Sequence, residues 1–211
     1  MTKNIAYTLL FLVLSSGAYA QLGITAGANI GKYHYGESRF DVHRKVLLSF
    51  NAGLQYKKKL NGHLFLLPEL SFTQKGTRVY YDYPIGYTGP MKNTNRLNYI
   101  QLTLPVMAAI PVSDDLDYEI GGGLYMAYLV KAIQQTFAFD GNSAKHDFTS
   151  GAFKKLDVGL HLTTGFRMGK KLGLHVHYDF GLTNIEGLSN SPSVKNRNCS
   201  INMSWLFAKH D

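Results

Sequence analysis

The sequence predicts an all-β fold, an eight-stranded antiparallel up-and-down transmembrane β-barrel, from three observations. From Leu172 to Leu182 every second residue is apolar, while the intervening positions are glycine, histidine or aspartate. Side chains alternate between the two faces of a strand, so this segment has one oily face and one polar face. The pattern recurs along the chain with no helical segment to cover the oily faces, and tyrosine and phenylalanine gather at the segment ends. Lipid is the natural covering for such faces in a closed barrel.

The first element is an export signal. Lys3 precedes an apolar run from Ile5 to Leu14, and Ala18-Tyr19-Ala20 fits a small-residue cleavage site before Gln21. The run is about half as long as the roughly 20 residues that a spanning helix needs. We therefore expect residues 1–20 to be a cleaved signal peptide and residues 21–211 to form one barrel domain.

Glycine, proline, asparagine and lysine divide the remaining chain into alternating segments and connections. Short connections at 58–62, 111–116 and 168–171 alternate with long ones at 34–46, 76–95, 135–152 and 185–196. Outer-membrane barrels have short periplasmic turns and longer extracellular loops in the same alternation. The eight expected strands are Gln21 to Tyr33, Leu47 to Lys57, His63 to Lys75, Arg96 to Ile110, Asp117 to Gln134, Phe153 to Arg167, Leu172 to Asn184, and Arg197 to Phe207.

Each strand has an apolar phase, such as Leu48, Phe50 and Leu54 in the second strand, which we expect to face lipid. The other phase carries acids, bases and histidines, which can pair with one another inside the barrel. The residues expected in this polar network of the lumen are Glu69, Glu119, Lys131, Asp157, His161, Arg167, His175, His177 and Asp179.

A soluble lipocalin-like barrel also has eight antiparallel strands, but its apolar residues point inward and its charges outward. Periodicity alone does not tell which phase points inward. The aromatic residues at the strand ends favour the membrane barrel, because they match its interfacial girdles. The crowding of ionisable groups on one phase favours it too, because a soluble barrel gains nothing from that arrangement.

The formal net charge is +8, and the loss of Lys3 with the signal peptide leaves +7. Much of this excess lies in turns and loops, for example at Lys195 and Arg197, and suits an anionic membrane surface or the phosphates of lipopolysaccharide. A nucleic-acid partner is not expected, since the chain has no basic helix and no zinc-ligand spacing. The single Cys199 excludes an internal disulfide, and its phase predicts a small lipid-facing residue.

Several segments carry a family resemblance. They are GITAGANIG at 23–31, LPELSFTQKG at 67–76, LNYIQLTLP at 97–105, GGGLYMAY at 121–128, FKKLDVG at 153–159 and YDFGLTN at 178–184. Together they resemble the PorT-like outer-membrane β-barrel proteins of Bacteroidota over essentially the whole chain after the signal. The resemblance implies an eight-stranded barrel in the outer membrane and, for some members, a role alongside type IX protein secretion.

Two clusters could carry chemistry in the lumen. His175 and His177 share a face, and His161 lies opposite Asp179 if the turn at 168–171 is tight. Such a histidine set is a possible zinc geometry, but nothing in the sequence marks supporting groups around it, so we expect a hydrogen-bonded lumen without metal or cofactor. The inward carboxylates could form a proton path. We expect lumen salt bridges instead, because an eight-stranded barrel is just wide enough for its own side chains.

The loops offer two further candidates. Tyr80, Tyr81, Tyr83 and Tyr87 lie among glycine and proline, which suits a recognition surface for a ligand or partner, although these rings could also extend the aromatic girdle. An outer-membrane acyltransferase or protease would need a rim site, for which the loops supply the residues Ser38, Asp41, His43, His146, Asp147 and Ser150. No G-x-S-x-G turn or triad spacing supports that site.

The sequence therefore predicts a non-catalytic integral protein of the outer membrane that docks or assists an envelope or type IX secretion complex. Its expected partners are outer-membrane lipid and lipopolysaccharide, together with secretion or envelope proteins. The alternatives are a porin-like barrel that binds or passes a small solute, and the acyltransferase or protease.

Overall fold

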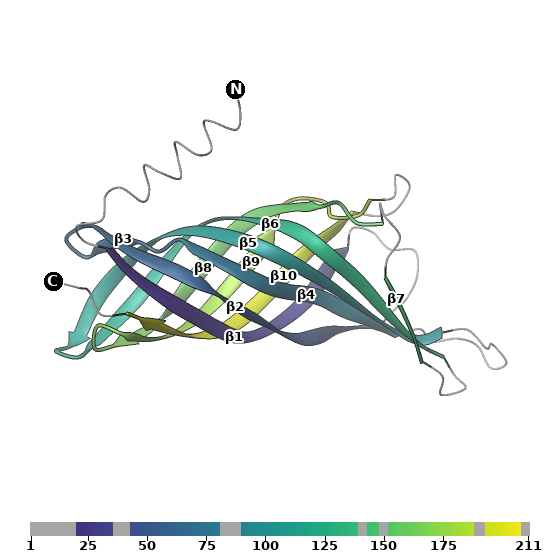
Figure 1. Cartoon of the computed structure of the whole chain (residues 1–211), viewed down its shortest axis with the longest axis horizontal. Helices are drawn as coiled ribbons and strands as arrows, with labels where there is room; N and C mark the ends of the chain where they lie inside the picture. Colours follow the sequence, from purple (N-terminus) through teal and green to yellow (C-terminus); the bar gives the residue numbers. More distant parts are fainter. Residues whose placement is uncertain are drawn as a thin grey trace, which may run out of the picture.

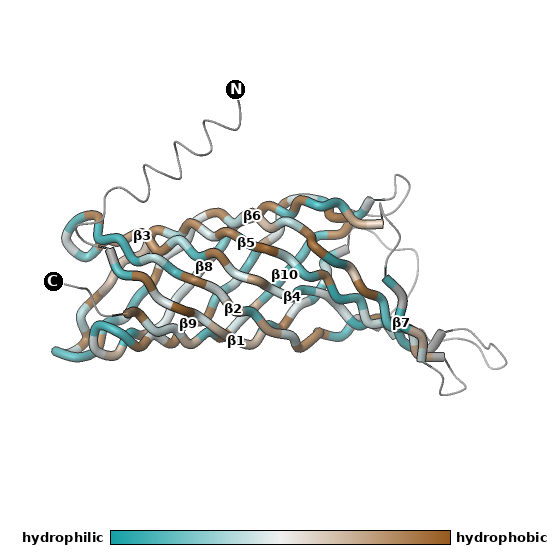
Figure 2. The backbone as a smooth tube through the Cα atoms, in the orientation of Figure 1, coloured by the Kyte–Doolittle hydropathy of each residue, from teal (hydrophilic) through white to brown (hydrophobic). Residues whose placement is uncertain are grey.

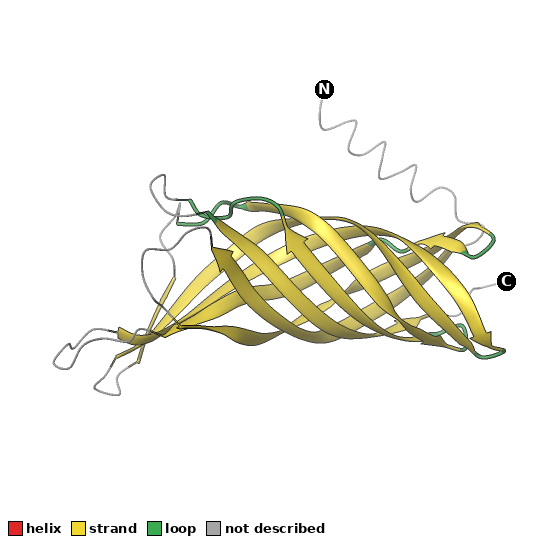
Figure 3. Ribbon diagram, turned by 180° about the vertical axis from the view of Figure 1, so that it is seen from behind, coloured by secondary structure: helices red, strands yellow, loops and turns green. Residues whose placement is uncertain are grey.

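The computed structural model describes residues 20–35, 43–80, 90–138, 143–147, 152–187 and 193–207. Almost all of them lie in strands (Figure 3). Among the described residues no helix is long and apolar enough to cross a membrane. The strands of these ranges are β1 (Ala20–Tyr35), β2 (His43–Asn61), β3 (Leu64–Leu66), β4 (Glu69–Tyr80), β5 (Pro90–Ser113), β6 (Leu116–Ala138), β7 (Ser143–Asp147), β8 (Leu156–Met168), β9 (Leu172–Gly181) and β10 (Val194–Leu206).

Within the described ranges, eight of these strands close into a barrel (Figure 1). Going round the wall the order is β1, β2, β4, β5, β6, β8, β9 and β10, every neighbouring pair is antiparallel, and β10 returns to β1. This arrangement confirms the predicted fold class. From β1 to β10, each strand of the ring pairs with the next ring strand along the chain, which antiparallel strands can do without a crossover.

The two ends of the barrel differ. At one end, called the turn end here, β1 begins and β10 ends, and short turns join β2 to β3, β5 to β6 and β8 to β9. Gly62 and Gly169 occupy two of these turns with φ of 49° and 56°, a left-handed conformation that glycine adopts without a steric penalty. The opposite end, called the loop end, holds the long connections.

The expected strand from His63 to Lys75 is interrupted. β3 and β4 both lie between β2 and β5, and they are separated at Leu67 and Pro68. Proline has no N–H to donate to the sheet. The wall stays closed there because Tyr56 N donates to Pro68 O at 2.9 Å and Leu67 N donates to Pro105 O at 3.1 Å.

At the loop end the strands run further than the sequence predicts. β5 begins at Pro90 instead of Arg96, and β6 continues to Ala138. The prediction that 135–152 is wholly a loop was wrong, because β7 folds back and pairs with residues 133–137 of β6. The polar composition of these segments hides their strands, because strand propensity depends on the neighbours with which a segment pairs.

The two phases of the wall separate as predicted, and Figure 2 shows hydrophobic and hydrophilic residues alternating along the strands. Outward apolar residues such as Leu48, Leu124 and Met203 are 66%, 58% and 62% exposed. Inward residues such as Thr25, Gln101 and Asn202 are buried. The barrel is therefore polar inside and apolar outside, the reverse of a soluble barrel.

Candidate functional site in the barrel interior

A buried carboxylate organises the lumen near the turn end. Glu119 on β6 is fully buried, and Arg167 on β8 donates to it from Nε at 2.8 Å and from Nη2 at 3.0 Å. Lys57 Nζ lies 2.8 Å from Glu119 Oε1, and His175 Nε2 lies 2.8 Å from Oε2. The side chain of Arg167 is buried as well. The pair is bidentate, the strongest form of carboxylate–guanidinium contact.

The register explains how Glu119 reaches His175 on a strand that is not its neighbour. Glu119 lies opposite Gly165 on β8, and Gly165 lies opposite His175 on β9. A Cβ atom at position 165 would lie 2.8 Å from Cδ2 of His175. The glycine therefore leaves the space across which the carboxylate and the imidazole meet.

Four ionisable side chains follow in the middle of the lumen. His161 lies directly opposite Asp179 in the register, as the sequence analysis predicts, and its Nδ1 is 2.7 Å from Asp179 Oδ1. The Nε2 of His161 is 3.1 Å from Nδ1 of His177. On the other side of the carboxylate, Lys75 Nζ is 3.0 Å from Asp179 Oδ2. One carboxylate thus holds a buried lysine and the first of two hydrogen-bonded histidines.

A second carboxylate, Asp157, completes this set toward the loop end. It accepts hydrogen bonds from Tyr125 Oη at 3.1 Å and from Asn196 Nδ2 at 2.8 Å, and Lys75 Nζ is 3.7 Å away. The same Nζ lies 4.1 Å from the ring centroid of Tyr125, within range of a cation–π interaction. Gly159 makes room for this ring, since a Cβ there would lie 2.6 Å from Tyr125 Cε1.

Asparagines fill the lumen beside the histidines. Asn51 and Asn202 exchange hydrogen bonds of 3.0 and 2.9 Å, and Asn51 also donates to Asn29 Oδ1. Asn29 in turn donates to Thr73 Oγ1 at 3.0 Å. Amides carry donors and acceptors together, so they can satisfy one another's hydrogen bonds inside the barrel.

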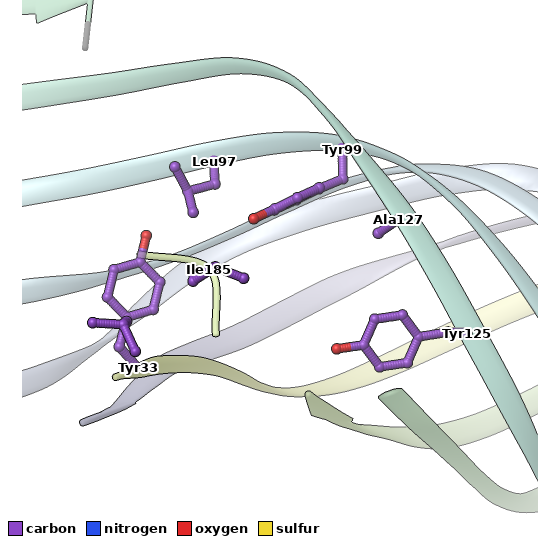
Figure 4. Close-up of a cluster of buried hydrophobic side chains, with 7 residues drawn as sticks. Tyr33, Leu97, Tyr99, Tyr125, Ala127 and Ile185 are labelled. Carbon is purple, nitrogen blue, oxygen red and sulfur yellow. The ribbon is translucent and has the colours of Figure 1, made fainter. Parts of the chain in front are cut away.

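Above the polar layers, apolar side chains close the loop end of the lumen (Figure 4). The cluster comprises Tyr33, Leu97, Tyr99, Tyr125, Ala127, Ile185 and Val194. Ile185 comes from the segment after β9, which turns inward: Ile185 N donates to Val194 O, and Lys154 N donates to Ile185 O, both at 2.8 Å. The sequence analysis places this residue in an extracellular loop, but it is fully buried.

The structure brings most of the predicted network together. Glu119, Asp157, His161, Arg167, His175, His177 and Asp179 are buried in the lumen, and Glu69 lines a small cavity beside them.

The placement of Lys131 in the lumen was wrong. Lys131 is 51% exposed and pairs at 3.0 Å with Asp147 on β7. The pairing of β5 with β6 explains the difference. Asn98 on β5 lies opposite Lys131, whereas the next residue, Tyr99, lies opposite Leu129, so Val130 is an extra residue on β6. Such a β-bulge reverses which phase of the strand faces outward.

The interior leaves little free space. The cavity between Glu69, Gln101, His161 and the asparagines measures about 20 Å³, which is close to the least that one water molecule needs. A pocket of about 330 Å³ at the turn end is lined by Lys57, Phe65 and Asp117. Lys57 bonded to Glu119 and the buried cluster of Phe65, Leu67 and Met107 separate this pocket from the rest of the lumen.

Within the described parts of the chain, no group of three or more His, Cys, Asp or Glu side chains is arranged to hold a metal ion. His161 and His177 bond to each other, and His175 bonds to Glu119. The three imidazoles are therefore engaged in a hydrogen-bonded network.

The predicted loop sites are only partly described. Tyr80 ends β4, and Lys45 Nζ lies 4.9 Å from its ring centroid. Tyr81, Tyr83 and Tyr87 lie outside the described residues, as do Ser38, Asp41 and Ser150. His43 on β2 lies opposite Tyr80, whereas His146 on β7 lies opposite Gln134. The strands β4, β5 and β6 therefore lie between the two histidines.

Some members of the network lie outside the predicted set. Lys57 ends the expected second strand, and nothing in its local sequence separates it from Lys58 and Lys59 in the turn that follows. Asn29, Asn51 and Asn202 do lie on the inward phase, so alternation alone could have placed them in the lumen.

Comparison with known proteins gives a family match. A sequence model described as "Outer membrane protein beta-barrel domain" matches residues 14–187. No curated protein sequence matches the chain.

Several solved barrels align with most of the chain at low identity. Ail, the attachment invasion locus protein of Yersinia pestis, is 14% identical, with 90% of this chain and 99% of that chain covered and a TM-score of 0.43. Neisserial surface protein A is 12% identical, with 89% and 99% covered and a TM-score of 0.46. OprG from Pseudomonas aeruginosa is 12% identical, with 90% and 97% covered and a TM-score of 0.46.

Proposed function

Since the chain belongs to the outer membrane protein β-barrel domain family, we propose that it is a non-conducting, non-catalytic anchor whose loop end docks an acidic protein of the cell envelope. The outward apolar wall suits a lipid bilayer, and the family match supports the outer membrane. In this proposal the turn end faces the periplasm and the loop end faces outward, as in barrels with short periplasmic turns.

The filled lumen supports an anchor over a porin-like barrel. Buried ion pairs, the asparagines and the cluster around Ile185 occupy successive levels of the interior. A solute would have to displace groups such as Arg167 and Lys75, whose partners are buried carboxylates. Separating a buried ion pair costs about 3–5 kcal/mol, so steady passage is not expected.

The observation that carries the docking proposal is a sheet that continues beyond the barrel. Pairing of β6 with β8 stops at Tyr128 and Leu156, yet β6 runs on to Ala138 between β5 and β7 (Figure 1). We call this extension the arm. It comprises residues 43–46 of β2, 77–80 of β4, 90–96 of β5, 133–138 of β6, and β7.

One face of the arm is basic and aromatic. Tyr80, Lys92 and Phe137 lie opposite one another in a row, and Lys92 Nζ is 5.8 Å from the ring centroid of Tyr80 and 4.7 Å from that of Phe137. The neighbouring row on the same face holds Lys45, Arg78, Thr94, Gln135 and Lys145.

Such a face suits an acidic protein surface. Rigid aromatic anchors give contact area at little entropic cost, and cations speed the encounter with an anionic partner. The resemblance to PorT-like barrels favours a component of a type IX secretion complex as that partner.

Site-specific photo-cross-linking in cells tests the docking role. A photoreactive phenylalanine analogue replaces Tyr80 or Phe137 on the arm, and Tyr178 on the lipid-facing wall serves as the matched control. We expect a discrete protein adduct from the arm positions that weakens in Lys45→Gln/Lys92→Gln. An adduct from Tyr178 alone, or none from the arm, would overturn the docking role.

Planar-bilayer recording tests the non-conducting part separately. The purified barrel should show no ion conductance, and steady open-channel current would reject the anchor in favour of the porin-like alternative.

We also propose that residues 1–20 are removed on export. β1 begins at Ala20, so cleavage before Gln21 removes only the first residue of that strand. N-terminal sequencing of protein from outer membranes should begin at Gln21, and a mature chain that retains Lys3 would contradict the cleavage.

A further inference from the structure

A second group of cations lies on the outer wall, at the seam where β1 meets β10. Lys32 on β1 is directly opposite Arg197 on β10, and His34 is directly opposite Lys195. These residues continue the outward phase that Ile30 and Ile201 occupy lower on the same strands. The seam therefore presents three permanent cations and a histidine toward the membrane side of the wall.

Like charges directly opposite each other on a sheet face destabilise it unless another group compensates them. No ion pair joins Lys32, Lys195 or Arg197 to a carboxylate within the described ranges. By contrast, the buried Lys75 and Arg167 are paired, and even the exposed Lys131 has Asp147. The seam thus concentrates positive charge without a carboxylate partner among the described residues.

The guanidinium of Arg197 is held in place before any ligand binds. Its central carbon lies 3.5 Å from the ring centroid of Phe180, the residue opposite it on β9. Its Nη1 donates to Gly181 O at 2.6 Å and to Asn196 O at 3.1 Å. The ring contact uses the face of the guanidinium, and both hydrogen bonds use Nη1. The N–H bonds on Nε and Nη2 can therefore bind an anion. A planar guanidinium with two such donors matches a phosphate group.

The height of the seam sets the source of that anion. Phe207, the last described residue, is outward at the turn end, and Arg197 is ten residues earlier on the same wall. Ten residues at about 3.3 Å each, tilted by about 40–45°, rise roughly 25 Å, which is the height of the apolar band of a membrane barrel. Arg197 and Lys32 therefore lie at the headgroup level of the outer leaflet.

We infer that Lys32, Lys195 and Arg197 form a binding site for the phosphate of an outer-leaflet glycolipid, with Phe180 fixing the guanidinium. Cations at a membrane surface are each worth about 1 kcal/mol toward anionic lipid. The site lies on the outer wall and uses none of the residues of the arm, so it does not depend on the docking proposal, although its assignment to the outer leaflet rests on the orientation proposed above. Phosphate is the recognised chemistry, and the acyl chains lie against the adjoining apolar wall.

Binding to purified, folded barrel in neutral detergent tests the site, with phosphorylated lipid A and the same lipid after dephosphorylation as probes. We expect Lys32→Gln/Arg197→Gln to weaken binding of the phosphorylated lipid by about tenfold or more, about 1.4 kcal/mol. Arg197→Lys should also weaken it, because it keeps the charge and loses the fork and the ring contact. Lys131→Gln, which removes a cation near the same level on the far side of the wall, is the matched control and should bind as the unchanged chain does.

Circular dichroism of each variant shows that the barrel is intact, and inorganic phosphate serves as the competitor that has no acyl chains. Equal affinity for the two lipids would overturn the site, as would unchanged binding in the double variant. Displacement of the lipid by an equal concentration of inorganic phosphate would overturn the assignment to a lipid.

Discussion

Replacing Glu119 by glutamine is the sharpest test of the lumen. The change removes one negative charge and keeps the shape, and it leaves Arg167 as a buried cation with no carboxylate partner. The described contacts of Arg167 are two hydrogen bonds to Glu119 and one of 3.4 Å to Lys171 O. Lys57 is 19% exposed and can turn toward the pocket at the turn end, so most of the loss falls on Arg167.

The magnitude follows from two estimates. Opposite charges about 4 Å apart attract by about 4 kcal/mol at an effective dielectric constant of about 20. Removal of one partner of a buried ion pair costs about 3–5 kcal/mol. We therefore expect Glu119→Gln to lower the free energy of unfolding by about 3–5 kcal/mol.

Urea unfolding in lipid vesicles measures this loss. Trp205 is the only tryptophan of the chain and lies on the outward face of β10, so its fluorescence reports transfer from lipid to water. Lys131→Met is the control, since the exposed pair of Lys131 and Asp147 is worth about 0–1 kcal/mol. Glu119→Gln/Arg167→Met should recover part of the loss, because it removes the stranded cation. A loss below about 1 kcal/mol in the single variant would refute the view that this ion pair maintains the lumen.

Three further predictions use the same unfolding assay. Val176→Arg puts a cation near the middle of the lipid-facing wall and should cost about 2–4 kcal/mol, against about 0–1 for Met168→Arg at the turn end; equal costs would contradict the orientation of the wall. Ile185→Ala should cost about 2–5 kcal/mol, and a neutral result would show that this residue does not plug the loop end. Gly169→Ala should cost about 1 kcal/mol through the left-handed backbone alone, since a Cβ there meets nothing within 4 Å, whereas Gly169→Asn should cost less; an Asn variant as unstable as the Ala variant would argue against that cause.

The strand pattern shows how far local information reaches. The alternation in 172–182 sets which residues of β9 share a face, the ionisable groups on one phase mark that face as the lumen, and His161 opposite Asp179 follows from one tight turn. Lys131 shows the limit. A single extra residue at Val130 reverses the phase beyond it, and the bulge depends on how β5 and β6 pair rather than on either sequence alone.

The candidate site was also predicted only in part from local sequence. Alternation and charge were enough to assign Glu119, Arg167 and His175 to the lumen. Their partnership depends on Gly165, which lies between Glu119 and His175 in a row across three strands. Lys57 and Ile185 were missed because one lies beside a turn and the other in a loop, and both point inward only once the barrel closes.

The sequence by itself determined the class of fold and the membrane as the surrounding medium, because each strand carries its own two-residue alternation, its aromatic ends and its crowding of ionisable groups on one phase. Only the tertiary structure decided which buried charges are partners, where the lumen is plugged, how far the arm extends, and that Lys32 lies beside Arg197. These features arise between residues as far apart in sequence as Lys32 and Arg197, and the hydrogen-bond register that aligns their strands is a property of the closed ring.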